Sequence, residues 1–338
     1  MKFLLAPIAW IYGFVVWLRN LLYDDHILHS TQVSIPTICV GNLAVGGTGK
    51  TPMAEYLISL LSSDYKVALL SRGYGRKTKG FRIANEHDTA QTIGDEPMQI
   101  HTHFPDIPVA VCADRVKGVK RLQQLFPDLQ CVILDDAYQH RKLRCGFYVL
   151  LTPYDCLYTN DHLLPWGRLR DLPNQSHRAN VVVVTKCPSQ MQPIDRRIVS
   201  NALHLASYQH LVYSSIGYAP IALNGTPLLV TGIANPLPLL EHLKAQCPDT
   251  ELLAFPDHHV FTKHDIAQIM HKAEQYSCVV TTEKDYMRLL QTPLVEQLGD
   301  KLHVISIQTN LGIDKETFDR QILLYVSENN RKLSTVNC

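Results

Sequence analysis

Short apolar segments alternate with segments of helical periodicity along most of this chain. In its first two thirds these apolar segments contain no polar alternation, which is typical of strands buried on both faces of a parallel sheet. The predicted strands are Ser34–Val40, Val67–Ser71, Pro108–Cys112, Cys131–Asp135, Phe147–Thr152 and Val181–Lys186. Helices are predicted between them at Pro52–Leu61 and Asp114–Phe126. The pattern predicts a P-loop NTPase-type α/β fold, doubly wound around a mostly parallel sheet.

A second α/β series begins at Leu211, and we place a domain boundary at the turn residues near Tyr218, beyond which we expect a smaller domain. Its predicted strands are Leu211–Ile216, Leu228–Thr231, Glu251–Phe255, Cys278–Thr282 and His303–Ile307. Its predicted helices are Pro236–Ala245, Lys263–Gln275, Lys284–Leu298 and Lys315–Tyr325. We therefore expect an apolar N-terminal helix in residues 1–30, a core domain at 31–218, a C-terminal α/β domain at 219–330 and a frayed tail at 331–338.

The N-terminal segment is uncharged and mostly apolar from Phe3 to Leu18, with Lys2 and Arg19 on its flanks. As a helix it would be about 24 Å long, which is less than the roughly 30 Å of a bilayer's hydrocarbon core. Its aromatic residues and flanking cations favour a helix lying in the membrane interface. A buried core helix and a true membrane span are the alternatives. A signal peptide is disfavoured because no small-residue cleavage site follows.

Charge and cysteine content exclude several other classes of protein. The chain has 338 residues and a formal net charge of +1, so it offers no global case for nucleic-acid binding. Its nine cysteines are odd in number, and no pair has the spacing of a zinc site. We therefore expect reduced thiols in a cytosolic protein.

A glycine-rich segment carries the most specific chemistry in the sequence. It follows an apolar strand, precedes a helix and reads Val45, Gly46, Gly47, Thr48, Gly49, Lys50 and Thr51. This is the layout of a phosphate-binding loop (Walker A), although Ala44 replaces the first glycine of the strict motif. Backbone N–H groups and the helix N-terminus would bind phosphates, Lys50 would reach the β- and γ-phosphates, and the Thr51 hydroxyl would hold Mg²⁺. The segment predicts binding of ATP or GTP.

Acidic residues follow at two places where a phosphoryl-transfer enzyme would need them. Asp135 and Asp136 end a predicted strand, the position at which P-loop proteins hold Mg²⁺. Asp95 and Glu96 stand at the start of a possible helix. An acid there could serve as the base for an acceptor hydroxyl, since a hydroxyl is a poor nucleophile. The alternatives are solvated loop acids for the first pair and helix capping for the second.

Cationic and histidine-containing segments complete the candidate chemistry. Arg72, Tyr74 and Arg76 lie in a flexible cationic loop after a strand, which suits an anionic acceptor or ATP. Arg168 and Arg170 could offset charge on a transferring phosphoryl group. His258, in Asp257-His258-His259, could pair with a carboxylate for acid–base work. A solvated basic loop and surface histidines are the alternatives.

Taken in order, these motifs resemble the tetraacyldisaccharide 4′-kinase family, the lipid A 4′-kinases of Gram-negative bacteria. The resemblance covers nearly the whole chain. Beyond the apolar N-terminus it rests on Gly41-Asn42 with the glycine loop, Ser71–Arg76, Gly94–Pro97, Asp135–His140, Leu163–Pro165, Phe255–His259 and Thr281–Asp285. The chain departs from the family pattern at Ala137, Tyr138 and the stretch Trp166–Leu172, so the resemblance assigns no role to Arg168.

The resemblance implies an activity and a set of residue roles. The family transfers the γ-phosphate of ATP to the 4′-hydroxyl of a membrane-embedded tetraacyldisaccharide 1-phosphate, making lipid IVA in lipid A and lipopolysaccharide biosynthesis. It implies ATP and Mg²⁺ as cofactors and a monomer at the cytoplasmic face of the inner membrane, docked there by its first helix. The implied roles are catalysis for Asp95, His258 and Lys50, metal binding for Thr51, Asp135 and Glu96, and substrate binding for Arg72, Tyr74, Arg76, Asp136 and Arg170.

Two other functions fit parts of the sequence. A membrane-associated P-loop ATPase switch of the partitioning kind would carry an extra lysine at position 45, where this chain has Val45. A soluble kinase of a small metabolite would need the apolar N-terminus to be a buried core helix. Stimulation of ATP consumption by a lipid A precursor, by a soluble sugar or by self-association would separate the three functions.

Overall fold

The computed structural model describes residues 5–223, 225–257, 259–290 and 292–336, and its largest element is an eight-stranded sheet. The strand order is β10-β9-β8-β2-β6-β3-β5-β4, and all neighbours are parallel except β4 and β5 at one edge. The strands are β2 (Thr37–Asn42), β3 (Val67–Ser71), β4 (Arg82–Ile83), β5 (Val109–Val111), β6 (Cys131–Asp135), β8 (Phe147–Pro153), β9 (Val181–Thr185) and β10 (His210–Tyr213). The expected doubly wound parallel sheet is confirmed.

Helices cover both faces of this sheet because neighbouring strand residues point to opposite sides. Ile38 and Val40 of β2 face one core, whereas Cys39 faces the other. The first face is covered by α2 (Lys50–Leu61), α4 (Asp95–His103) and α11 (Lys315–Val336). The second is covered by α5 (Arg115–Leu125) and α6 (Pro193–Leu203). The short helix α3 (Ala90–Ile93) precedes α4, and β1 (Thr31–Gln32) pairs with β7 (Leu143–Arg144) outside the main sheet.

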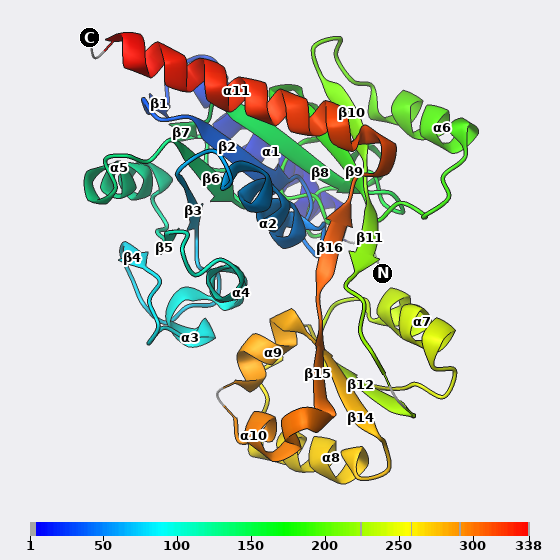
Figure 1. Cartoon of the computed structure of the whole chain (residues 1–338). Helices are drawn as coiled ribbons and strands as arrows, with labels where there is room; N and C mark the ends of the chain where they lie inside the picture. The colour runs from blue at the N-terminus through cyan, green and yellow to red at the C-terminus, as the bar shows by residue number, and fades with distance from the viewer. Residues whose placement is uncertain (1–4, 224, 258, 291, 337–338) are drawn as a thin grey trace.

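A separate four-stranded parallel sheet forms the lower part of the molecule in Figure 1. Its strand order is β13 (Glu251–Ala254), β12 (Pro227–Thr231), β14 (Cys278–Thr282) and β15 (Leu302–Ile305). One face packs on α8 (Lys263–Ala273), α9 (Glu283–Leu289) and α10 (Leu294–Leu298), and the other on α7 (Leu237–Gln246). We refer to the part built on this sheet as the small lobe and to the part built on the larger sheet as the core lobe.

The two lobes are joined by an antiparallel pair of strands, β11 (Ser215–Tyr218) and β16 (Ile307–Asn310), seen between them in Figure 1. The segment expected as one strand at Leu211–Ile216 is divided here between β10 in the large sheet and β11 in this connection.

The last helix does not lie where the sequence-based division puts it. That division assigned residues 219–330 to the small lobe and 331–338 to a frayed tail. Instead α11 crosses back over the large sheet and continues to Val336. Phe318, Ile322 and Val326 form one fully buried stripe in the core beside α2. The periodicity of this stripe predicts a helix, but it contains no information about which sheet the helix covers. We therefore propose a division in which α11 belongs to the core lobe.

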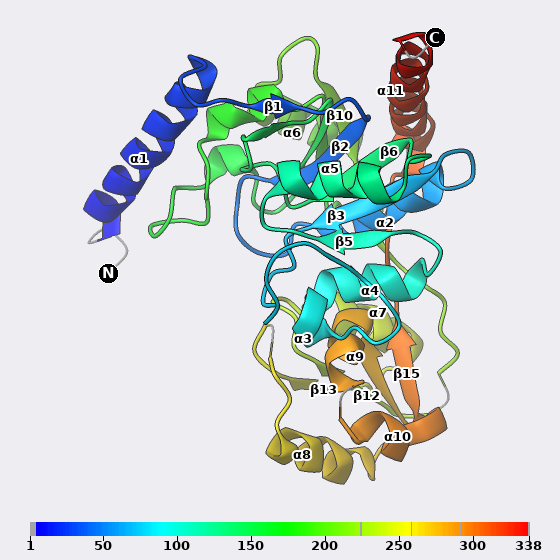
Figure 2. The ribbon, with the colours of Figure 1, turned by 90° about the vertical axis from the view of Figure 1, so that its left-hand side faces the viewer.

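Helix α1 (Ala6–Asp24) lies at one side of the core lobe, and α11 lies at the other (Figure 2). Most of its large apolar side chains are exposed, with Trp10, Ile11 and Phe14 among the most accessible. The exposure of these side chains therefore argues against the alternative that this segment is a buried core helix. Within the described ranges, no helix has both the length and the apolar character needed to cross a bilayer.

Candidate active site

The glycine-rich loop connects β2 to α2, and Lys50 and Thr51 are the first two residues of that helix. Gly46 and Gly49 have φ angles of 105° and 88°, in the left-handed region that favours glycine. The loop is fixed at Thr48, whose side chain is buried. Asn42 Nδ2 donates to Thr48 Oγ1 at 2.7 Å. This geometry leaves the loop at the carboxyl edge of a parallel sheet, where nucleotides bind in open α/β folds.

The segment from Arg168 to Arg170 supports the loop from outside. The Val45 N–H donates to the Arg168 carbonyl at 2.8 Å, and the Arg170 N–H donates to the Leu43 carbonyl at 2.8 Å. The Arg168 guanidinium itself is turned to Asp161, with an Nε–Oδ2 distance of 3.2 Å. Arg168 therefore supports the loop through its backbone.

Asp135 stands at the carboxyl end of β6, the strand next to β2. It is almost fully buried, and Ser71 Oγ donates to its Oδ2 at 3.1 Å. Its Oδ1 has no hydrogen-bond partner among the described residues. Burial, together with the negative charges of Glu96 and Asp136, raises the pKa of Asp135 to about 7. A buried carboxylate with one unsatisfied oxygen, facing two further acids, fits the oxygen ligands that Mg²⁺ prefers.

Asp136 is the centre of an ionic cluster. Arg170 Nη1 donates to its Oδ2 at 3.0 Å, and Arg170 Nη2 contacts both its Oδ1 and the Oδ1 of Asn42. Lys50 Nζ lies 3.9 Å from Asp136 Oδ1. Burial favours the neutral acid, but the hydrogen bonds from Arg170 and the charge of Lys50 outweigh it and lower the pKa of Asp136 to about 2. Four of the predicted residues therefore meet at one place: Lys50, Asp135, Asp136 and Arg170.

Asp95 is the first residue of α4, and a residue of the small lobe contacts its carboxylate. Arg288 of α9 donates to Asp95 Oδ2 from Nε at 2.8 Å and from Nη2 at 2.6 Å. Arg288 Nη1 also donates to Asp285 at 3.0 Å, and Asp285 is fully buried. His258, the predicted catalytic partner of Asp95, lies outside the described residues. Arg288 was not identified from the sequence, where only the preceding Thr281–Asp285 motif marks its neighbourhood.

The cationic loop lies beside the start of α4. A Cβ placed on Gly94 would be 2.9 Å from the Tyr74 carbonyl oxygen, which shows how closely the two segments pack. The loop lines a pocket of about 380 Å³, and Arg72 and Tyr74 are among the residues that line it. The Arg76 guanidinium donates to the Gly80 carbonyl at 2.7 Å and so closes the loop on itself.

Two further cations were not identified from the sequence, one beside Asp136 and one beside the phosphate loop. Arg115, at the start of α5, is 2% exposed and donates to the carbonyl of Asp136 at 3.3 Å. Lys186 follows β9 with a φ of 58°, and its Nζ would lie 3.9 Å from a Cβ on Gly47. Arg115 lies near the start of a predicted helix and Lys186 ends a predicted strand, and neither position marks a phosphate-binding cation by itself.

A separate charged cluster bridges the lobes on the far side of α4. His103 Nδ1 lies 3.1 Å from Glu55 Oε1 of α2, and His103 Nε2 lies 2.8 Å from Glu283 Oε1 of α9. Gln99 Nε2 donates to both carboxylates, at 3.0 and 3.2 Å. Hydrogen bonds to Glu283 and Glu55 raise the pKa of His103 to about 10. Because its two nitrogens face two different carboxylates, this imidazole acts as a cationic bridge.

The chain resembles known proteins over almost its full length. Residues 1–327 match the family model described as Tetraacyldisaccharide-1-P 4′-kinase. A tetraacyldisaccharide 4′-kinase of Bacteroides thetaiotaomicron is 43% identical, covering 98% of this chain and 94% of the relative. One from Flavobacterium johnsoniae is 44% identical, covering 96% and 97%.

A solved structure shares the fold. The crystal structure of LpxK from Aquifex aeolicus in complex with ATP has a TM-score of 0.73 and 24% identity, covering 96% of this chain and 99% of that one. The coverage and identity of the sequence relatives, together with the family match, establish the relationship. This chain belongs to the tetraacyldisaccharide-1-P 4′-kinase family.

Proposed function

We propose that this protein transfers the γ-phosphate of ATP to the 4′-hydroxyl of tetraacyldisaccharide 1-phosphate, the reaction that makes lipid IVA. The observation that carries the proposal is the meeting of Lys50, Asp135 and Asp136 at the carboxyl ends of two neighbouring parallel strands. That arrangement suits phosphoryl transfer, where catalysis is mostly positioning and electrostatic stabilisation.

The donor half of the site consists of the glycine loop and its cations. Backbone N–H groups of residues 46–49 bind phosphate oxygens, since the Val45 N–H is already bonded to the Arg168 carbonyl. Lys50 leaves Asp136 and pairs with the γ-phosphate when ATP binds. Arg170 stays beside Asp136 and offsets the charge of the phosphoryl group. Thr51, Asp135 and Glu96 would hold Mg²⁺, and this assignment is supported by Asp135 Oδ1, which accepts no hydrogen bond from the part of the chain that the structure describes. An ion held there would supply positive charge to offset the charge of the phosphates.

The acceptor half is assigned to Asp95 and the cationic loop. Asp95 accepts the proton of the 4′-hydroxyl while that oxygen bonds to the γ-phosphorus, and the bond to the bridging oxygen of ADP breaks. Arg72, Tyr74 and Arg76 suit a sugar that already carries a phosphate, because guanidinium groups bind phosphate well. The pairing of Asp95 with His258 stays a prediction.

We also assign the protein to the cytoplasmic face of the bacterial inner membrane, as a monomer that docks through α1. The exposed Trp10, Phe14 and Trp17 support this assignment, since aromatic side chains favour the headgroup boundary. Replacing all three with alanine should abolish flotation with anionic lipid vesicles. The matched control replaces Ile194 and Ile198, two exposed apolar residues of α6, and should still float. Equal flotation of both variants would contradict docking through α1.

The reaction itself is tested by acceptor dependence. ATP consumption is measured with detergent-dispersed tetraacyldisaccharide 1-phosphate, with a soluble glucosamine sugar and with no acceptor, and the lipid product is examined by mass spectrometry. We expect ATP consumption only when the lipid acceptor is present, and we expect the lipid product to carry one added phosphate at its 4′ position. Turnover without lipid would favour the ATPase switch, and turnover with the sugar would favour the small-metabolite kinase.

A further inference from the structure

Helix α1 has an unusual distribution of side chains, because its large apolar residues face outward and its small ones face the protein. The buried positions are Ala9, Gly13, Val16 and Asn20, which recur every three or four residues along one face. A Cβ on Gly13 would lie 2.7 Å from Leu163 Cδ1, so the helix packs closely on the segment that precedes Arg170. Asn20 is 2% exposed and is the one polar residue among these four.

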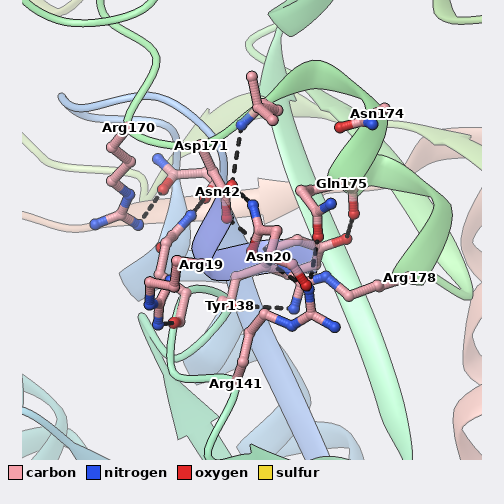
Figure 3. A network of polar contacts seen from close by, with 12 residues as sticks. Arg19, Asn20, Asn42, Tyr138, Arg141, Arg170, Asp171, Asn174, Gln175 and Arg178 are labelled. Atoms are coloured by element: carbon pink, nitrogen blue, oxygen red, sulfur yellow. Dashed lines mark hydrogen bonds and ion pairs between the residues drawn. The ribbon is translucent and has the colours of Figure 1, made fainter. Parts of the chain in front are cut away.

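Asn20 is held in a buried polar network, shown in Figure 3. Its Nδ2 donates to Asp171 Oδ1 at 2.8 Å, and Asp171 is fully buried. The same carboxylate oxygen accepts from the Leu172 N–H at 3.0 Å. Arg141 Nη1 donates to the Asn20 carbonyl at 3.1 Å and to its Oδ1 at 3.3 Å. Asn20 therefore joins α1 to the residue next to Arg170.

A second contact from α1 reaches Arg170 itself. The Tyr12 hydroxyl donates to the Arg170 carbonyl at 2.9 Å. On its other side, the Arg170 N–H donates to the Leu43 carbonyl at the start of the phosphate loop. The backbone of Arg170 is thus fixed between α1 and this loop, and its guanidinium extends from there to Asp136 and Asn42.

Polar burial of this kind has to be explained, because it costs stability. A buried carboxylate is expensive to desolvate, and well-packed apolar residues in its place are often as stable or more stable. Hydrogen bonds, unlike apolar contacts, fix direction and distance. The Asn20–Asp171 pair therefore suits a place where the position of the backbone matters, and the neighbouring residue is the cation of the candidate site.

We propose that Asn20 and Tyr12 are positioning residues for Arg170, so that α1 is part of the framework that places this cation for phosphoryl transfer as well as a surface helix. The assignment of Arg170 to phosphoryl transfer rests on the proposed function. A helix whose outer face is apolar and whose inner face fixes Arg170 also links the seating of α1 on lipid to the geometry of the phosphate site.

The test is a double-mutant cycle between Asn20 and Arg170. Asn20→Leu keeps the size of the side chain and removes its hydrogen bonds, and Arg170→Ala removes the cation. We expect Asn20→Leu to lower kcat about 10-fold in the wild-type background, the scale of a lost hydrogen bond to a buried charge, and to have no further effect in Arg170→Ala. The matched control, Asn201→Leu on the exposed face of α6, should change kcat by less than about twofold.

Two further variants separate positioning from folding. Asn20→Asp combined with Asp171→Asn reverses the polarity of the pair and should recover most of the kcat that Asn20→Asp loses alone. Tyr12→Phe removes only a hydroxyl, so it should fold even if Asn20→Leu does not. Its effect on kcat should likewise disappear in the Arg170→Ala background. Losses that are equal in the presence and absence of the Arg170 side chain would overturn the proposal.

A second readout keeps this test independent of the acceptor reaction. The same cycle is measured on the dissociation constant of a non-hydrolysable ATP analogue. If wild type phosphorylates no disaccharide, the proposed function fails, whereas non-additive effects of Asn20 and Arg170 on analogue binding would still support the positioning role. Additive effects there, or none from Asn20, would overturn it.

Discussion

At the scale of single residues, Gly41 shows how tightly the strand before the phosphate loop is packed. A Cβ on Gly41 would lie 2.5 Å from Tyr138 Cβ and 3.2 Å from its backbone nitrogen. Gly41→Ala should therefore lower the free energy of unfolding in urea by about 1–3 kcal/mol, the usual cost of overpacking. Gly217→Ala is the control, because its nearest contact is at 3.5 Å. Equal losses in the two variants would contradict the steric argument.

Part of the candidate site could be predicted residue by residue, because these residues belong to short motifs that are continuous in the sequence. Lys50 and Thr51 belong to one short motif, and Asp135 ends a strand that a parallel sheet brings beside that motif. Arg288, Arg115 and Asn20 could not be predicted in the same way. Their importance comes from partners far along the chain, and no local pattern marks a buried Arg or Asn as the partner of a particular acid.

At the scale of elements, strands were predicted more reliably than the placement of helices. Apolar runs such as Cys131–Asp135 and Cys278–Thr282 have the predicted bounds, because burial on both faces leaves a clear signal. The run at Leu211–Ile216 was predicted as one strand, yet its two halves belong to different sheets. Periodicity identifies an element and its buried face, but long-range packing decides which neighbour it joins.

Helix α11 allows the division between the lobes to be tested. Phe318 is fully buried against α2, and Leu324 on the same helix is half exposed. Phe318→Ala should destabilise the core lobe by about 3–5 kcal/mol, because it leaves a cavity in a packed core. Unfolding is followed in urea with and without an ATP analogue. Because the phosphate loop belongs to the core lobe, the stabilisation by the analogue reports on the folding of that lobe. Leu324→Ala should cost far less. If Phe318→Ala left analogue-linked unfolding unchanged, α11 would not belong to this lobe.

At the scale of the whole molecule, contacts between the lobes bear on the candidate catalytic base. Arg288 of the small lobe donates twice to one oxygen of Asp95 in the core lobe. Arg288→Met should lower kcat about 10-fold, since a charge-assisted hydrogen bond that orients the carboxylate is lost. Arg288→Lys, which keeps the charge without the planar fork, should lose less. Affinity for an ATP analogue should change less than about twofold, and a loss of affinity with unchanged kcat would contradict this role.

The His103 bridge between the lobes should make their association depend on pH. In an unfolded chain His103 would have a pKa near 6.5, whereas Glu283 and Glu55 raise the pKa of His103 to about 10 in the folded protein. The folded state therefore keeps a proton that the unfolded state loses. The stabilisation is fully present below about pH 6.5, declines as the pH rises, and is lost once it passes about 10.

Glu283 belongs to the small lobe. Losing the stabilisation that protonated His103 provides should therefore make the two lobes unfold less cooperatively as the pH rises. The free energy of unfolding in urea, measured from about pH 6.5 to about pH 10, should fall in wild type. His103→Gln should be less stable at the lower pH and should show a shallower decline, since its amide does not titrate. His271→Gln, at an exposed position on α8, should keep the wild-type slope. An identical slope in all three proteins would show that the bridge between Glu55 and Glu283 does not depend on the charge of His103.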